Sequence, residues 1–460
     1  MELKIVTRPD EVNVTASRAI SHLSRLPAGW RRERLDAVTE GVFDCPHSTP
    51  HLTSSGPFVA RSQDIRGGRL SVEGTAHVSL ETYRERIARA EPRYGDLLFS
   101  REGTYFGIAA EVPAQIKVCL GQRMVLIRSI TELVDFRFLR FWLNSPTVAA
   151  HVDGFRDGSV AERLNLPTIR SLPVVLPPLA EQLQISKLLG ALDDRTESNR
   201  RTSETLEAMA RALFKSWFVD FDPVQAKNEG LTPIGMNSET AKLFPSSFDS
   251  VRRIPYGWRL DSIGDAVTVV GGSTPSTTES SFWNGRHRWV RPKDLSDVAV
   301  SVLTGTERTI TDAGLATISS GLLPAGTVLL SSRAPIGYLV VTRIPVAINQ
   351  GFIAMKCTGD ISPYYVLNWT RTAMDEIKGR AGGTTFPEIS KQAFRPIQVL
   401  VPTRDIVQAF ESIVAPMYEK IAANVVQSEL LAELRDTLLP KLMSGELRIK
   451  DAEKLASDAL

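Results

Sequence analysis

The sequence predicts an α+β fold: two α/β domains separated by two long antiparallel helices that form a coiled coil, with a pseudo-two-fold internal repeat. Three observations lead to this prediction. The 460-residue chain contains two copies of one pattern, each copy begins with short β-like runs, and each copy ends in a long heptad-patterned helix.

The internal repeat is visible as short matches that keep the same order. The pattern Pro-x-Gly-Trp of residues 27–30 recurs at 255–258, and Gly95–Arg101 resembles Gly326–Arg333. Each match is weak alone, but the nearly constant offset makes a duplication the simplest explanation. The other matches pair residues 61–65 with 291–295, 119–122 with 347–350, and 176–178 with 401–403.

Residues 27–178 and 255–402 are predicted to be the two α/β domains. Short runs of β-branched and aliphatic residues, such as Thr327–Leu330 and Gly337–Thr342, are broken by glycine and proline. Short helical stretches such as Asp135–Leu143 lie between such runs. We therefore expect small sheets with tight turns and a few short helices in each domain.

Residues 179–222 and 403–447 are predicted to be long helices. Between Leu179 and Trp217 there is no proline, and apolar or small residues recur at alternating spacings of four and three, as in a coiled-coil seam. The pattern returns 225 residues later and turns polar at the same layer. Either stripe alone would fit a core helix, but two matched stripes favour pairing with each other. The predicted pairing residues are Leu189, Leu192, Asn199, Leu206, Leu213, Val414, Met417, Asn424, Leu431 and Leu438.

Three further segments complete the organisation. Residues 1–26 are an N-terminal extension, and residues 448–460 are a tail. Residues 223–254 contain Gly230, Pro233 and Gly235, so we expect a loosely ordered connector that leads into the second domain.

Composition limits the class of protein. No run of 18 apolar residues occurs, so a transmembrane helix is not expected, and the charged start of the chain lacks the apolar core of a secretory signal. Three widely spaced cysteines fit a reduced, cytoplasmic protein. The net charge of +2 does not by itself indicate nucleic-acid binding.

No persuasive catalytic or metal motif is present. The Walker phosphate loop is absent, and so is the Asn-Pro-Pro-Tyr type of tetrapeptide; residues 222–224 are the nearest string. Cys45, His47 and His51 are three potential ligands around a predicted loop, short of the four that a structural zinc site takes, so no metal is predicted. Asp193 and Asp194 are expected to be solvated or to face a partner. The chain is therefore predicted to be non-catalytic by itself.

Two similar domains at a fixed separation suit duplex DNA. A helix of about 37 residues spans ~55 Å, compared with ~34–36 Å for one duplex turn. The two copies have diverged in sequence, so we expect two different half-sites and an asymmetric bipartite target.

The segment 176–224 carries a specific resemblance. It reads Leu-Pro-Pro-Leu-Ala-Glu-Gln-Leu-Gln-Ile at its start and Lys-Ser-Trp-Phe-Val-Asp-Phe-Asp-Pro-Val at its end. This sequence resembles the central conserved region of the specificity (S) subunits of type I restriction–modification systems. Gly272–Ser276, Asn349–Gly351 and Leu438–Leu447 resemble the same family.

The resemblance implies fold, partners and cofactors. Residues 27–178 and 255–402 would be target-recognition domains 1 and 2, with 179–222 as the central and 403–447 as the C-terminal conserved helix. The implied partners are double-stranded DNA, two methyltransferase (M) subunits that modify adenine, and two restriction (R) subunits; no membrane partner is implied. S-adenosylmethionine, ATP and Mg²⁺ would belong to the partner subunits, with no cofactor in this chain.

Basic residues at loop-like positions are the DNA-contact candidates, because Arg and Lys pair with phosphates and guanine edges. Any of them could instead be a solvated surface residue, and the repeated ones could form scaffold ion pairs with Asp64, Asp294 or Glu102. Residues His47, Ser48, Thr49, Ser273 and Thr274 could help to set base preference or simply form turns. The basic candidates are Arg61, Arg101, Arg123, Arg156, Arg163, Arg291, Lys293, Arg333, Lys378, Arg380 and Lys391.

Two alternatives to a specificity subunit stay open at this point. The repeated domains could form a protein-interaction scaffold without DNA readout. The chain could also be an enzyme with fused recognition domains, although its 460 residues show no catalytic half.

Overall fold

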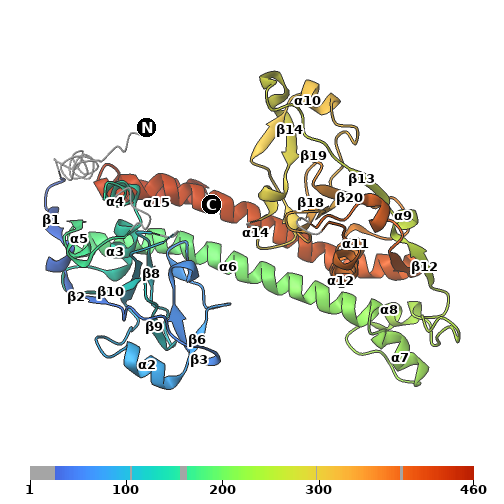
Figure 1. Ribbon diagram of the computed structural model, residues 1–460, viewed down its shortest axis with the longest axis horizontal. Coiled ribbons are helices and arrows are strands. Elements are labelled where there is room, and N and C mark those ends of the chain that lie inside the picture. The colour runs from blue at the N-terminus through green and yellow to red at the C-terminus, as the bar shows by residue number, and fades with distance from the viewer. Residues whose placement is uncertain (1–25, 104–105, 156–162, 297, 384–386, 460) are drawn as a thin grey trace. The chain divides into compact units, whose positions relative to one another are not determined.

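A computed structural model describes the chain except for residues 1–25, 104–105, 156–162, 297, 384–386 and 460. The chain divides into two compact units. Unit 1 comprises Met1–Arg195 and Leu431–Leu460, and unit 2 comprises Thr196–Leu430. The predicted extension, residues 1–26, therefore lies almost entirely outside the described residues. Figure 1 labels the elements of both units.

The first domain lies in unit 1 and contains three sheets among its described residues. The largest has the order β2-β10-β7-β8-β5-β4, a second has the order β6-β3-β9, and β1 pairs with β11. The strands are β1 (Arg31–Arg34), β2 (Thr39–Asp44), β3 (Leu52–Ala60), β4 (Ile65–Arg66), β5 (Arg69–Leu70), β6 (His77–Val78), β7 (Asp96–Ser100), β8 (Ala109–Glu111), β9 (Val118–Leu120), β10 (Met124–Ser129) and β11 (Pro173–Leu176). The helices are η2 (Leu35–Ala37), η3 (Ser62–Asp64), α2 (Leu80–Arg86), α3 (Phe136–Leu143), α4 (Pro146–Asp153) and α5 (Leu166–Arg170).

The second domain lies in unit 2. Its sheets have the orders β13-β20-β17-β18-β15, β16-β14-β19 and β12-β21. The strands are β12 (Arg259–Ser262), β13 (Thr268–Gly271), β14 (Trp283–Val290), β15 (Val302–Leu303), β16 (Arg308–Ile310), β17 (Val328–Ser331), β18 (Leu339–Thr342), β19 (Val346–Ile348), β20 (Phe352–Lys356) and β21 (Gln398–Val401). The helices are α9 (Ile263–Ala266), η4 (Ser280–Phe282), η5 (Pro292–Leu295), α10 (Asp312–Ala316), α11 (Pro363–Thr372), α12 (Met374–Gly379) and α13 (Lys391–Phe394).

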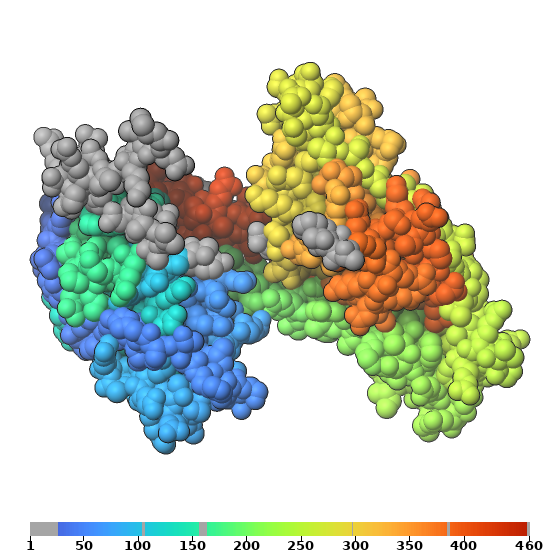
Figure 2. All heavy atoms as spheres, viewed as in Figure 1, coloured from blue at the N-terminus to red at the C-terminus, as the bar shows by residue number. Residues whose placement is uncertain are grey.

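The two domains follow one plan. The neighbours β2-β10-β7-β8 of domain 1 correspond to β13-β20-β17-β18 of domain 2. In each domain a long strand pairs in parallel with a short one, β3 with β9 and β14 with β19. In unit 2, β14, β16 and α10 form a lobe that projects from the rest of the domain, drawn in yellow in Figures 1 and 2. The duplication in the sequence is therefore also a duplication of strand order.

Two long helices are each shared by both units: α6 (Leu179–Phe218) and α14 (Arg404–Ser444). Within unit 2 they meet at a polar layer. Asn199 Nδ2 donates to Ser428 Oγ at 3.3 Å, and Asn424 Nδ2 donates to Ser203 Oγ at 3.1 Å. Both asparagines are buried. Because buried amides must find partners, this layer favours one register of the two helices.

Apolar residues flank the polar layer on both sides. In unit 2, Val414 is fully buried, and Leu206, Leu213 and Met417 pack against the same core. In unit 1, the other four apolar residues of the predicted seam are buried in one core with domain 1: Leu189, Leu192, Leu431 and Leu438.

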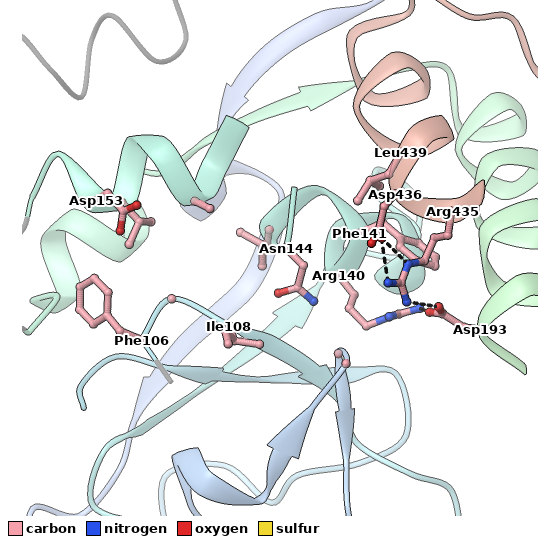
Figure 3. Close-up of a pocket in the computed structure, with 16 residues that line it drawn as sticks. Phe106, Ile108, Arg140, Phe141, Asn144, Asp153, Asp193, Arg435, Asp436 and Leu439 are labelled. Atoms are coloured by element: carbon pink, nitrogen blue, oxygen red, sulfur yellow. Dashed lines mark hydrogen bonds and ion pairs between the residues drawn. The ribbon is translucent and has the colours of Figure 1, made fainter. Parts of the chain in front are cut away.

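A buried carboxylate joins the helices to domain 1, which corrects the prediction for Asp193. Its oxygens accept from Arg140 Nη2 of α3 and Arg435 Nη1 of α14, both at 3.0 Å. Figure 3 shows these side chains on one wall of a pocket. Asp193 directly follows the seam residue Leu192 and is buried between α6, α3 and α14, so it is neither solvated nor free for a partner. Asp194, one residue on, is exposed and pairs with Arg69.

In unit 2, a different buried carboxylate joins α6 to domain 2. Glu207 of α6 is buried, and its Oε1 accepts from Ser301 N at 3.1 Å and from Arg371 of α11. Each domain is thus held to the helices by a buried acid–arginine contact, although the acid stands at different places on α6.

The predicted loose connector is instead folded, which corrects that prediction. After α6 the chain turns at Phe221, which has a φ of 57°, and forms α7 (Asp222–Asn228) and α8 (Ser238–Leu243). Phe244 is buried and packs edge-on against Trp217, with ring centroids 4.9 Å apart. Burial of aromatic side chains, which composition alone did not reveal, orders the segment.

The C-terminal tail also contains structure. The helix α15 (Ile449–Ala459) follows Gly445, whose φ of 73° suits the end of α14. Ala452 is fully buried in the core of unit 1. Residues 448–460 therefore belong to the first compact unit.

Candidate nucleic-acid interface

Arg61 and Arg291 occupy equivalent positions, and each forms an ion pair with an aspartate three residues later. Arg61 Nε lies 2.9 Å from Asp64 Oδ2, and Arg291 Nη2 lies 3.2 Å from Asp294 Oδ1. In both cases the backbone N–H of the arginine also donates a hydrogen bond to the carboxylate of the same aspartate. Ion pairing with hydrogen bonds raises the pKa of Arg61. These contacts match the ion-pair alternative that the sequence left open.

Arg101 is buried, which corrects its prediction as a DNA contact. Its side chain is 3% exposed, and its Nη1 lies 2.6 Å from Asp44 Oδ1. A guanidinium that is enclosed and already paired offers no surface to a phosphate or base. Arg101 therefore supports the loop that follows β2.

The backbone also shows that Arg101 and Arg333 are not equivalent. Arg101 N donates to Arg123 O, and Ser332 N donates to Gly351 O in the same place of domain 2. An extra serine before Arg333 shifts the sequence match by one residue. Arg333 is instead the counterpart of Glu102.

The two domains carry opposite charges at this point. The backbone of Glu102 forms an isolated antiparallel β-bridge with Arg163 in domain 1, whereas the backbone of Arg333 forms one with Glu388 in domain 2. Arg123 Nε lies 3.6 Å from Glu102 Oε1 and is half exposed. Arg333 Nη1 lies 3.6 Å from Glu388 Oε2 and is partly exposed. Arg123, Arg163 and Arg333 thus remain surface candidates for DNA contact.

The other basic candidates of domain 2 lie on its surface. Lys293 is exposed on η5, and Lys391 is exposed at the start of α13 beside Gly271. Lys378 is exposed on α12, and Arg380 pairs with Glu376 at 2.7 Å. In domain 1, Arg156 lies outside the described residues.

Sequence reasoning missed one feature. Ser48-Thr49-Pro50 is repeated, letter for letter, 225 residues later as Ser273-Thr274-Pro275. From the sequence alone, these positions are assigned to base preference or to turns, whereas the offset of 225 residues shows that they are one repeated tripeptide. The two stretches lie in loops that follow β2 and β13, and both threonines are exposed.

The group around Cys45 is explained by contacts within the protein. Asp44, Cys45 and His47 bring one potential ligand atom each within 4.8 Å of one another. Asp44 is already paired with Arg101 at 2.6 Å and with His47 at 3.1 Å. Burial raises the pKa of the Cys45 thiol, which disfavours the thiolate that binds zinc. No metal is proposed here.

The sequence matches a known family over most of its length. The family described as type I restriction modification DNA specificity domain matches residues 75–208 and 255–423. The two stretches contain both domains' central parts and much of both long helices. The chain belongs to this family.

Individual relatives are distant but extensive. The HindI specificity subunit of Haemophilus influenzae is 25% identical over 78% of this chain and 88% of the relative. The MjaIX specificity subunit of Methanocaldococcus jannaschii is 28% identical over 82% of this chain and 83% of the relative. Both are specificity subunits of type I restriction enzymes.

A solved structure shares the fold. The crystal structure of a type I restriction–modification S subunit from M. genitalium has a TM-score of 0.56 with this specificity-family chain. It is 15% identical and covers 91% of this chain and 96% of its own. In the described residues, no helix is both long and apolar enough to cross a membrane.

Replacing Arg101 tests whether it is a scaffold residue. We expect Arg101→Met to lower the free energy of unfolding by about 3 kcal/mol, because Asp44 loses its buried partner. The half-exposed Arg123 is the matched control, and Arg123→Met should change stability by less than about 1 kcal/mol. Chemical denaturation of both variants measures this. A stable Arg101→Met protein that fails to bind DNA would show the assignment to be wrong.

Proposed function

We propose that this chain is the DNA sequence-specificity subunit of a type I restriction–modification complex and that it recognises an asymmetric bipartite duplex target. One observation carries the proposal. Two domains with the same strand order are joined by two long helices that both units share. At ~1.5 Å per residue, the 40 residues of α6 extend over ~60 Å. That length suits two half-sites that are more than one duplex turn apart.

The asymmetry of the proposed target rests on surface residues that differ between equivalent positions. Glu102 in domain 1 stands where domain 2 has Arg333, and Arg163 stands where domain 2 has Glu388. Reversed charges present different donors and acceptors to a groove. The two domains are therefore proposed to read different half-sites.

The partners proposed for this chain are two M subunits, docked on the helices, and two R subunits of the same complex. Several apolar side chains on α6 and α14 are exposed within the chain, which favours a protein partner there. They are Leu183, Met209, Val426 and Leu430. S-adenosylmethionine, ATP and Mg²⁺ would be bound by those subunits. In this proposal the chain is non-catalytic and cytoplasmic, and its role is to recognise the DNA target sequence.

Genome-wide mapping of methyladenine in the host tests the proposal. With the chain present, we expect methylation at a two-part motif with a fixed spacer, and deletion of the chain should remove it. Re-expression of the chain should restore the same motif. An unchanged methylation map after deletion would count against the proposal, and a complex that assembles but prefers no duplex would favour the scaffold alternative.

A further inference from the structure

We infer that Thr49 with Gln122, and Thr274 with Gln350, form two equivalent DNA-contact pairs that bind the phosphate backbone of each half-site. The inference rests on the proposed function and deepens it. It divides the interface into a part common to both domains and a part that differs between them.

The two pairs have the same geometry. Thr49 Oγ1 donates to Gln122 Oε1 at 2.7 Å in domain 1, and Thr274 Oγ1 donates to Gln350 Oε1 at 2.6 Å in domain 2. Both threonines belong to the repeated Ser-Thr-Pro. Both glutamines lie just after an equivalent strand, β9 or β19. Since partners and elements agree, the pair is one feature of the repeat.

The strand ends that carry the glutamines are also fixed alike. Gly121 N donates to Ala60 O at 2.7 Å, and Asn349 N donates to Val290 O at 3.0 Å. Each bond joins the residue before the glutamine to the end of the long parallel strand, β3 or β14. The glutamine backbone is therefore positioned by the sheet itself.

The threonine loops are held by different side chains in the two domains. In domain 1, the buried Arg86 donates from Nη1 to Ser48 O at 3.1 Å and from Nε to Leu120 O at 2.8 Å. In domain 2, Trp289 Nε1 donates to Ser273 O at 3.3 Å. The same carbonyl position is thus anchored by unrelated donors. The position of the threonine is retained although the residues that hold it have changed.

A second indole stiffens the loop of domain 2. Trp283 Nε1 donates to Ser276 O at 2.9 Å, and the guanidinium of Arg308 stacks 3.7 Å above the Trp283 ring. Loops fixed in this way present their side chains with little entropy left to lose on binding. Rigid polar pairs whose threonines are exposed fit a contact that must be ready before DNA arrives.

The chemistry of the pair points to a phosphate acceptor. The threonine hydroxyl occupies Oε1 of the glutamine and so orients the amide, leaving the two N–H donors of Nε2 without an acceptor among the described residues. Glutamine amides commonly donate to phosphate oxygens, and such contacts carry no sequence information. Because the proposed half-sites differ, a feature that is identical in both domains suits what both half-sites share.

Basic side chains lie close to each pair. Arg123 directly follows Gln122 and is half exposed. In domain 2, Gly351 follows Gln350, and a Cβ added to Gly351 would lie 3.0 Å from Pro292, the residue before the exposed Lys293. A cation next to each pair adds attraction for the DNA backbone.

The test exchanges each glutamine for glutamate in the full chain, assembled with its partner subunits. A carboxylate still accepts the threonine hydroxyl, so Gln122→Glu and Gln350→Glu keep the loop tie. They replace the outward donors by negative charge. Binding is measured as Kd for the mapped target duplex and for a scrambled duplex of equal length.

We expect each variant to weaken binding to both duplexes about tenfold or more, because a hydrogen bond to a charged acceptor is lost. The ratio of the two Kd values should stay unchanged, and the double variant should combine the two losses. Gln115→Glu and Gln398→Glu add the same charge at exposed positions away from the pairs and should leave Kd nearly unchanged.

Two results would overturn the inference. If only target binding weakens, so that the Kd ratio falls, the pairs read bases; if neither Kd changes, the pairs merely tie the loops together. A failure of the proposed function itself looks different, because the unmodified complex would then bind both duplexes equally.

Discussion

Inserting one heptad into each long helix is expected to lengthen the spacer of the methylated motif by about three base pairs. Seven residues add ~10 Å of helix, and a base pair occupies ~3.4 Å along the duplex. The insertions are placed after Ser203 in α6 and before Asn424 in α14. These two residues are hydrogen-bonded to each other, so the two added heptads begin at the same level of the helix pair. A whole heptad keeps the seam in phase.

Methyladenine mapping reads this result directly, because both half-sites should persist while the distance between them changes. Methylation at the original motif should be lost. The control is the same insertion in α6 alone, which displaces Asn199 from Ser428 and Asn424 and should prevent assembly. If the matched insertion leaves the spacer unchanged, the helices do not set the half-site distance.

Replacing Asp193 is expected to be among the most destabilising single changes in unit 1. Asp193→Ala leaves Arg140, which is 3% exposed, and Arg435 without their shared carboxylate. Removing one partner of a buried ion pair costs about 3–5 kcal/mol, and we expect about 3 kcal/mol here, because Arg140 keeps Glu111 at 2.8 Å and Arg435 keeps Asp436 at 2.8 Å. Calorimetry should show the loss in the transition of unit 1.

The neighbouring residue provides the control for this change. Asp194→Ala removes an exposed ion pair with Arg69 and should cost less than about 1 kcal/mol. Asp193→Asn keeps the size and one acceptor, so its effect should lie between the two alanine variants. Equal stability of the two alanine variants would contradict the buried network.

Patterns in short stretches of sequence were enough to predict the types of secondary structure, the two long helices and the family. The repeat and the heptad spacing are properties of neighbouring letters, and the structure shows mixed sheets and two long helices where those patterns occur. The family match extends over both copies. The connector was predicted poorly because its order depends on Phe244 meeting Trp217, and no local pattern encodes that contact.

The site was less predictable for a related reason. Whether an arginine is free or paired depends on residues that are distant in sequence, as for Arg101, whose partner Asp44 lies 57 positions away. A list of DNA contacts based on basic charge alone therefore included arginines that are buried or paired within the protein. The pairing of each threonine with a glutamine does not follow from charge, because both side chains are uncharged, although the repeat contained the signal in Ser48–Pro50 and Ser273–Pro275.

The division of the chain into compact units has a consequence for biosynthesis. The core of the first unit includes Leu442 and Met443 as well as Trp30 and Leu35, whereas the second unit is one continuous stretch, Thr196–Leu430. On the ribosome, the second unit is therefore complete first, and the first unit cannot close its core until residues 431–460 emerge. A nascent chain released before that point would expose the unfinished core to chaperones and proteases.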